Sequence, residues 1–143
     1  MIIQGTPEWF AARAGKVTAS RVADVIAKTK TGPSASRTNY AAQLVAERLT
    51  GTVEPSFTNA AMQWGTDKEP DARNAYSFRY YVDVDLVGFV DHVTIPMAGA
   101  SPDGLIGDVG LVEIKCPNTA THIATLLDGK VPTKYFPQIQ WQL

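Results

Sequence analysis

A carboxylate and an ammonium group stand two positions apart in a short segment near residue 113. Residues 111–115 read Leu-Val-Glu-Ile-Lys, an alternation typical of a half-buried strand, so Glu113 and Lys115 are expected on one face. Asp103 lies ten positions before Glu113, with three glycines between them, and this spacing favours a hairpin. The hairpin would bring two carboxylates and one lysine to a single site.

Two close carboxylates repel each other, and a divalent cation relieves that repulsion. Oxygen ligands without a thiol or an imidazole pair suit Mg²⁺ or Mn²⁺, which would act as Lewis acid and water activator for phosphodiester hydrolysis. Lys115 would position the attacking water or stabilise the developing charge. An ordinary surface hairpin carries the same residues, so the segment alone leaves both interpretations open.

Length and composition describe an ordinary globular chain. The 143 residues are 45% hydrophobic and suit one domain, and the single cysteine, Cys116, excludes an internal disulfide and a multi-cysteine zinc site. No apolar run is long enough to span a bilayer, and the first residues lack a secretion signal. We therefore expect a protein of the cytoplasm.

Charge is distributed unevenly along the chain. The net charge is only −1, which argues against a protein that coats nucleic acid. Residues 1–50 carry seven Lys or Arg against three acids, whereas residues 51–100 carry three against seven. This distribution suits a nuclease, with cations facing the substrate and acids near a metal.

The N-terminal region suggests an anion pocket. Thr6 and Pro7 start a helix over Glu8–Ala14, with Trp9 and Phe10 expected in the core. Ser20 is predicted to cap a second helix over Arg21–Ala27, next to Arg13 near the end of the first. Helix N–H groups, a hydroxyl and a guanidinium together attract phosphate, although plain capping explains the same residues.

Further elements follow from periodicity and turn residues. Lys28–Arg37 reads as a basic loop, either a contact for backbone phosphates or a solvated linker. A helix is expected over Tyr40–Thr50 with Leu44, Val45 and Leu49 inward, followed by a long helix over Thr58–Phe78 that is entered through Asn59 and has a kink or fresh start at Pro70. Strands are expected within Tyr80–Val93 and Thr94–Ala100. A further helix is expected over Asn118–Leu127, with Ile123, Leu126 and Leu127 buried. Near the C-terminus, Tyr135, Gln138 and Gln142 share a face of a helix that begins about Pro137.

Helices before and after a run of short strands predict an α/β or α+β fold in one domain over residues 1–143. A mixed central sheet of about four strands, flanked by helices, is expected.

Four segments taken together resemble the phage lambda exonuclease family, also called the YqaJ-like viral recombinase family, among the PD-(D/E)XK nucleases. They are residues 9–20, 64–73, 101–104 and 111–117, with Pro102-Asp103 and Glu113-Ile114-Lys115 fitting the signature. The resemblance implies a restriction-endonuclease-like core. It also implies a Mg²⁺-dependent exonuclease that degrades one strand of duplex DNA in the 5′-to-3′ direction in phage-type recombination.

The resemblance assigns roles to individual residues. It implies catalytic roles for Glu69, Asp103, Glu113 and Lys115, and metal ligation by Asp103, Glu113, the carbonyl of Ile114 and Glu69. It implies that a terminal 5′-phosphate is bound by Arg13, Ser20 and Ser101. Tyr135 and Gln138 are implied to lie beside the site as substrate-binding residues. Within the acidic run at residues 67–71 it selects Glu69 alone, and Asp67 and Asp71 are expected on a solvated face.

The resemblance also implies partners: linear duplex DNA with a 5′-phosphate, a ring of three subunits and a single-strand annealing protein. Relatives continue beyond the last segment, so the family's C-terminal portion is expected to be missing here. Two alternatives stay open, a PD-(D/E)XK endonuclease or single-strand nuclease and a truncated DNA-binding remnant without catalysis. The intact set of acids speaks against the remnant.

Overall fold

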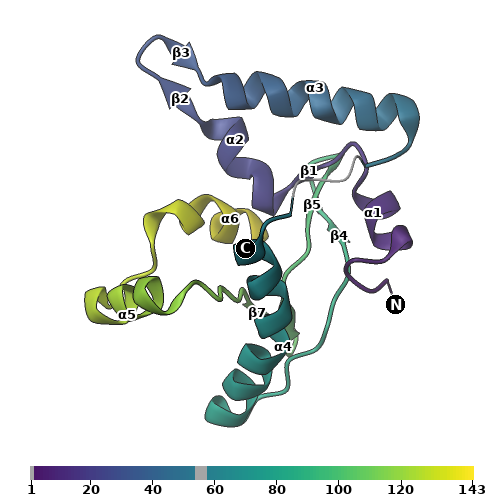
Figure 1. Ribbon diagram of the computed structural model, residues 1–143. Helices are drawn as coiled ribbons and strands as arrows, with labels where there is room; N and C mark the ends of the chain where they lie inside the picture. Colours follow the sequence, from purple (N-terminus) through teal and green to yellow (C-terminus); the bar gives the residue numbers. More distant parts are fainter. Residues whose placement is uncertain (1, 54–57) are drawn as a thin grey trace. The chain divides into compact units, whose positions relative to one another are not determined.

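A computed structural model describes residues 2–53 and 58–143. The chain forms two compact units. Figure 1 shows the ribbon coloured by residue number. Unit 1 contains residues 2–53, Val87–Ser101 and Lys134–Leu143. Unit 2 contains residues 58–86 and Pro102–Thr133. No helix among the described residues has the length and apolar character needed to cross a membrane.

Unit 1 is built on a mixed three-stranded sheet in the order β1 (Val17–Thr18), β5 (Ala98–Ala100), β4 (Val90–Asp91). β1 runs parallel to β5 and β4 runs antiparallel to it. A Cβ atom at Gly99 would lie 2.4 Å from the Phe89 ring and from the Val90 carbonyl, so glycine permits the close approach of the strands. A mixed sheet was predicted, but β1 was not.

Helices cover this sheet. They are α1 (Pro7–Arg13), the 3₁₀ turn η1 (Ala19–Arg21), α2 (Val22–Ile26), α3 (Ala35–Thr50) and α6 (Phe136–Gln142). α2 packs against α3, and α6 packs against η1, α2 and β5 (Figure 1). The small core contains Ala19, Val22, Tyr40, Leu44, Ala98 and Ala100. Trp9 is half-buried, whereas Phe10 is exposed, so the prediction of a buried Phe10 is wrong.

The segment at residues 28–37 is ordered, contrary to the predicted loop. β2 (Lys28–Thr29) and β3 (Gly32–Pro33) form an antiparallel hairpin. Ser34 caps α3, which begins at Ala35, five residues before its predicted start. The inward face of α3 is also different from the prediction: Tyr40, Leu44 and Glu47 are buried, while Val45 and Leu49 are exposed. Glu47 can lie on the buried face because its carboxylate accepts a hydrogen bond from the buried backbone N–H of Gly15.

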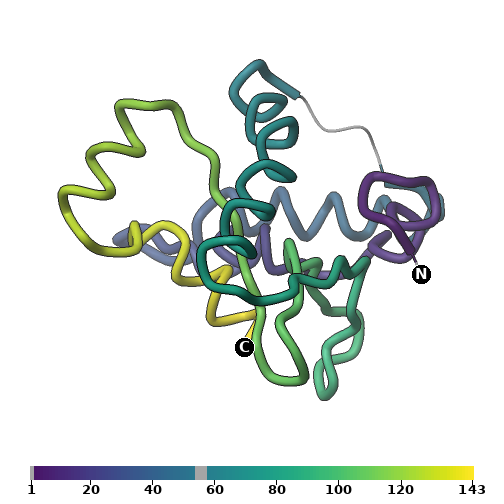
Figure 2. Tube along the Cα trace, turned by 90° about the horizontal axis from the view of Figure 1, so that it is seen from below, coloured from purple at the N-terminus to yellow at the C-terminus, as the bar shows by residue number. Residues whose placement is uncertain are grey.

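Unit 2 combines the helix α4 (Ala60–Tyr80), the antiparallel hairpin of β6 (Gly104–Ile106) and β7 (Gly110–Val112), and the helix α5 (Thr119–Asp128). Asn59 and Asn118 cap α4 and α5 through their side chains, as helix N-termini require. α4 continues through Pro70 as one helix, which Figure 2 shows along the Cα trace. The 3₁₀ turn η2 (Thr133–Tyr135) precedes α6.

Two further predictions fail in detail. Of the strands expected over residues 80–100, the described chain forms β4, β5 and a single bridge between Asp85 and Leu105. Ile123, Leu126 and Leu127 on α5 are exposed, although their spacing predicted burial. An apolar stripe marks one face of a helix, but burial also requires a partner surface.

Candidate active site

The hairpin of unit 2 brings Asp103 and Glu113 opposite each other. Gly104 pairs with Val112 at the open end of β6 and β7, so Asp103 and Glu113 are the next residues beyond the last pair. A Cβ atom at Gly104 would lie 2.2 Å from Cγ1 of Val84, and glycine is therefore needed here for packing. The predicted fold-back of the two acidic residues is present.

Asp103 is held by the chain that follows Glu113. Its Oδ2 accepts a hydrogen bond of 2.6 Å from the backbone N–H of Ile114. Burial raises the pKa of the Asp103 carboxyl to about 6, and the charges of Glu113 and Glu69 act in the same direction. The Ile114 N–H and the Lys115 ammonium oppose the shift. The Asp103 carboxylate is therefore close to other negative charge with little solvent to stabilise it.

Arg73 connects α4 to the hairpin. Its guanidinium forms an ion pair with Glu69, one helical turn earlier, and its Nε donates a hydrogen bond of 3.1 Å to the backbone carbonyl of Asp103. Glu69 is thereby oriented on the side of α4 that meets the hairpin. No role was predicted for Arg73, although the spacing of four residues places it on the same helical face as Glu69.

Lys115 bonds to Glu113 through its ammonium group. The two side chains therefore lie on one side of the chain, as predicted. The predicted strand over residues 111–115 is too long, however, because β7 ends at Val112. Glu113 has 8% of its side chain exposed and Lys115 has 35%, so the lysine is the more accessible of the pair.

The donors of this cluster suit a hard divalent cation, since they are carboxylate and carbonyl oxygens. Within residues 2–53 and 58–143, no three Asp, Glu, His or Cys side chains converge as a preassembled metal site. Glu69 pairs with Arg73 and Glu113 with Lys115 in this structure. Burial, reinforced by the charges of Glu113 and Glu69, raises the pKa of the Asp103 carboxyl, and bound Mg²⁺ or Mn²⁺ would favour its charged form, so the residues fit such an ion.

In unit 1, Trp9 links two of the residues assigned to phosphate binding. The guanidinium carbon of Arg13 lies 3.9 Å from the centroid of the Trp9 ring, and Trp9 Nε1 donates a hydrogen bond of 2.9 Å to Ser101 Oγ. Burial lowers the pKa of Arg13, while Tyr40 and Glu47 oppose that shift. Trp9 was predicted only as a core residue, and its role as a bridge depends on a contact with a residue far along the chain.

Ser20 is exposed within η1 and does not cap a helix. η1 already begins at Ala19, and Arg21 occupies the N-cap position of α2 without a side-chain cap bond. The Oγ atom of Ser20 instead lies 3.2 Å from Oγ1 of Thr18. Because β1 and β5 are parallel, Ser20 and Ser101 both follow the C-terminal ends of neighbouring strands, so the sheet directs both toward the same edge.

Tyr135 and Gln138 belong to unit 1. Tyr135 stands at the N-cap of α6, with the Lys134 ammonium 4.9 Å from its ring centroid, and Pro137 lies in the first turn of that helix. Gln138 is half-buried on the same helix, which packs against η1. The helix therefore begins where it was predicted to begin.

The model of the YqaJ-like viral recombinase domain matches residues 8–143. This chain belongs to that family. A search of curated proteins gave no match.

The YqaJ-like chain is also similar to two crystal structures of LHK-Exo, an alkaline exonuclease from Laribacter hongkongensis, one of them in complex with dAMP. Each is 58% identical in sequence and superposes with a TM-score of 0.85 over 96% of this chain. This chain spans about two thirds of their length, 67% and 66% respectively. The predicted family and the restriction-endonuclease-like α+β fold are confirmed.

The charge state of Asp103 makes the stability of the metal-free YqaJ-like domain depend on pH. The pKa of this carboxyl is higher in the folded chain, at about 6, than its ordinary value of 3.8, so folding takes up a proton between these values. The free energy of unfolding should therefore fall as pH rises from about 4 to 6. Solvent screening of the partly exposed carboxyl reduces the ideal cost of about 3 kcal/mol to about 1–2 kcal/mol.

Asp103→Asn should remove this dependence and stabilise the metal-free protein at pH 8, because an amide oxygen still accepts the Ile114 N–H without carrying charge. Urea unfolding in EDTA at pH 4, 5, 6 and 8 measures the effect. Asp108→Asn changes an exposed acid at the tip of the same hairpin and serves as the control. A wild-type pH profile in Asp103→Asn would show that Asp103 does not carry the dependence.

Proposed function

We propose that this chain is a Mg²⁺-dependent DNA exonuclease, with Mn²⁺ as a substitute ion, that hydrolyses linear duplex DNA from 5′-phosphorylated ends. The observation that carries the proposal is the juxtaposition of Asp103 and Glu113 at the open end of the β6–β7 hairpin, with Lys115 bonded to Glu113. The 58% identity to an alkaline exonuclease supports it.

The residues of unit 2 would hold the ion through oxygen atoms. Asp103, Glu113 and the carbonyl of Ile114 provide ligands, and Glu69 completes the set directly or through water. When bound, the ion polarises the scissile phosphate and lowers the pKa of its water. Arg73 holds Glu69 and the backbone of Asp103 near the hairpin, and Glu69 and Glu113, which pair with Arg73 and Lys115 in this structure, would turn toward the ion on binding.

Lys115 would act on the attacking water. Its ammonium group donates hydrogen bonds and carries positive charge, and its contact with Glu113 keeps it beside the ligands. A donor fixed at that position orients the water oxygen toward phosphorus and stabilises the negative charge that develops on the phosphoryl oxygens. Lys115 is in this proposal a catalytic residue and not only a contact to DNA.

Arg13, Ser20 and Ser101 would bind the terminal phosphate of the substrate. The Arg13 guanidinium stacks on Trp9 and is thus held in one orientation, and the hydroxyl groups follow neighbouring parallel strands. A fixed guanidinium forms charge-assisted hydrogen bonds with phosphate oxygens. Tyr135 and Gln138 would extend the substrate contacts of unit 1, with the Gln138 amide bonding a phosphate oxygen.

The proposal includes the partners and setting of the family: a ring of three subunits around DNA, a single-strand annealing protein, and action in the cytoplasm of the host cell during phage-type recombination. Size-exclusion chromatography with light scattering tests the ring directly.

The test of function uses linear duplex DNA labelled at either end, with a 5′-phosphate or a 5′-hydroxyl, in Mg²⁺ or EDTA. Release of nucleotides from the 5′ strand in Mg²⁺ alone supports the proposal. Internal cuts would favour an endonuclease, and digestion of single strands only would favour a single-strand nuclease. Binding without cleavage would favour a non-catalytic remnant.

Arg13→Ala should erase the preference for phosphorylated ends. Loss of a hydrogen bond between charged partners reduces cleavage of phosphorylated ends by about tenfold or more, while hydroxyl ends lose little. Initial rates on both ends measure the ratio, with Arg37→Ala, an exposed cation of α3, as the control. Equal losses on the two kinds of end would instead make Arg13 a general backbone contact.

A further inference from the structure

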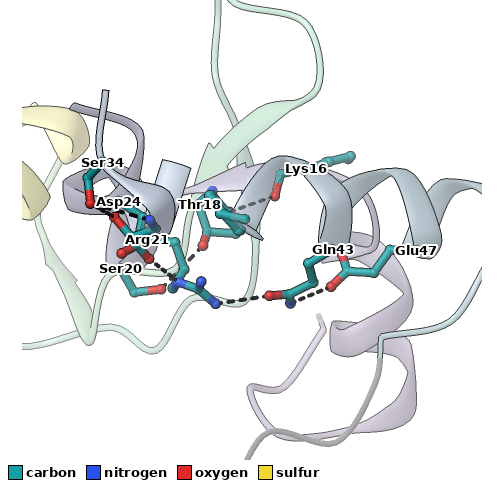
Figure 3. Close-up of polar contacts among 10 residues, drawn as sticks. Lys16, Thr18, Ser20, Arg21, Asp24, Ser34, Gln43 and Glu47 are labelled. Atoms are coloured by element: carbon teal, nitrogen blue, oxygen red, sulfur yellow. Dashed lines mark hydrogen bonds and ion pairs between the residues drawn. The ribbon is translucent and has the colours of Figure 1, made fainter. Parts of the chain in front are cut away.

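Glu47 is a buried acid that the proposed chemistry does not use. Only 4% of the residue is exposed, which is unusual for a carboxylate. Its Oε2 accepts a hydrogen bond of 2.8 Å from the backbone N–H of Gly15, and its Oε1 accepts one of 2.8 Å from Nε2 of Gln43. Figure 3 shows Gln43 between Glu47 and Arg21, whose Nη1 donates to the Gln43 amide oxygen. Both carboxylate oxygens therefore have a partner.

The peptide groups of Gly15 are held from both sides by α3. Arg48, the next residue after Glu47, donates a hydrogen bond of 2.8 Å from Nε to the Gly15 carbonyl. Gly15 has a φ of +69°, and a Cβ atom there would lie 2.4 Å from Cγ of Arg48. Neighbouring residues of one helix thus bind the donor and the acceptor of a glycine that has the left-handed conformation and no space for a side chain.

This turn carries the residues assigned to the terminal phosphate. The Arg13 carbonyl accepts a hydrogen bond of 3.0 Å from the Lys16 N–H, closing a turn around Gly15. Arg13 stands just before that turn, while β1 and then Ser20 come just after it. Because the turn joins α1 to β1, a shift of Gly15 would change the position of β1 and Ser20 relative to Arg13.

We propose that Glu47 is a positioning residue for the terminal-phosphate pocket: by binding the Gly15 N–H it fixes the turn that places Arg13 and Ser20 for one phosphate group. This inference rests on the proposed function of Arg13, Ser20 and Ser101. Glu47 touches no substrate in this scheme. Its negative charge also lies close enough to Arg13 to favour the charged guanidinium.

A purely structural role for Glu47 makes a different prediction. Loss of a buried hydrogen bond would then lower the folded fraction, and the rates on phosphorylated and hydroxyl ends would fall together. A positioning role lowers the rate on phosphorylated ends selectively. The ratio of the two rates separates the roles because the folded fraction cancels.

The experiment compares five variants, one of them Arg13→Ala, with wild type by initial rates on 5′-phosphate and 5′-hydroxyl duplex ends. Urea unfolding in separate samples measures the stability of each. Glu47→Ala should lower the ratio by about tenfold, because it leaves the Gly15 N–H without its acceptor. Glu47→Gln should keep the ratio within about threefold, because the amide still accepts from Gly15. Arg48→Met keeps the aliphatic stem of an exposed side chain and should lower the ratio by about threefold.

Leu44→Ala is the matched control, since it removes a buried side chain of the same helix and leaves Gly15 untouched. It should reduce stability and leave the ratio unchanged. An equal fall of the ratio in Leu44→Ala and Glu47→Ala would overturn the proposal, as would a wild-type ratio in Arg48→Met and Glu47→Ala. If Glu47→Ala does not fold, Arg48→Met decides alone.

The rates of wild type and Arg13→Ala distinguish failure of the proposed role of Glu47 from failure of the proposed phosphate pocket. A wild-type enzyme without any preference for phosphate would refute the pocket, and the role of Glu47 with it. A preference that Arg13→Ala removes and the Glu47 and Arg48 variants retain would refute the role of Glu47 alone.

Discussion

Asp103→Asn is expected to reduce DNA hydrolysis by at least about a thousandfold, since a bound ion contributes several kcal/mol of transition-state stabilisation and each 1.36 kcal/mol is tenfold in rate. The amide keeps the hydrogen bond from the Ile114 N–H, so the hairpin should be preserved. What the variant loses is an anionic ligand at the open end of β6 and β7. Single-turnover cleavage in Mg²⁺ measures the effect.

Crystals soaked in Mn²⁺ provide the second readout for this variant. Wild type should show an anomalous peak between Asp103 and Glu113, and Asp103→Asn should not. Asp108→Asn, in the turn of the same hairpin, should retain both the peak and the activity. A peak elsewhere in wild type, or full activity in Asp103→Asn, would contradict the assignment of Asp103 as a ligand.

The same substitution should stabilise the metal-free protein while it abolishes catalysis. The wild-type chain buries Asp103 and holds it close to Glu113 and Glu69, and burial together with these charges raises the pKa of its carboxyl. Such a cost to stability is expected where a site must bind a cation, because the ligands are arranged for the bound state. Stability and activity should therefore change in opposite directions at this position.

Lys115→Ala is expected to slow single-turnover cleavage by about a hundredfold or more, the effect of removing one preorganised stabiliser of transition-state charge. Its ammonium group bonds to Glu113 and is the more exposed partner, so it can reach a water beside the ligands. Binding should change little, because one group that acts mainly in the transition state contributes little to the ground-state complex. Cleavage at saturating DNA isolates the chemical step.

Binding in Ca²⁺ across several salt concentrations provides the comparison. A lysine that only contacts the DNA backbone would, when removed, weaken affinity and reduce its salt dependence, because fewer counterions are released. Lys28→Ala, on the exposed β2–β3 hairpin, is a suitable test of that behaviour. Full recovery of cleavage by Lys115→Ala at saturating DNA would limit Lys115 to substrate binding.

Burial of α3 illustrates where periodicity misleads. Hydrophobicity assigned Leu44, Val45 and Leu49 to the inner face, but only Leu44 is buried. The face is set instead by Tyr40 and Glu47, whose polar atoms meet Thr18 and Gly15. A charged residue is placed outside by any rule based on composition, because the sequence does not show that backbone N–H groups and an amide will satisfy it.

The sequence by itself determined the features that depend on neighbours within about one turn or one hairpin. Glycine spacing and alternation predicted that Asp103 and Glu113 would meet, and the residues Thr6 and Asn59 located two helix starts. These signals are reliable because dihedral preference and capping act over a few residues.

Only the tertiary structure decided the contacts between residues distant in sequence. β1 has two residues and exists through its pairing with β5, about eighty positions later, and this pairing sets Ser20 and Ser101 on one edge. Arg73 binds the backbone of Asp103, and Trp9 binds Ser101, through side chains whose distant partners local pattern does not specify. Such contacts form because folding fixes the distance and direction between elements, and that information is absent from any short stretch of chain.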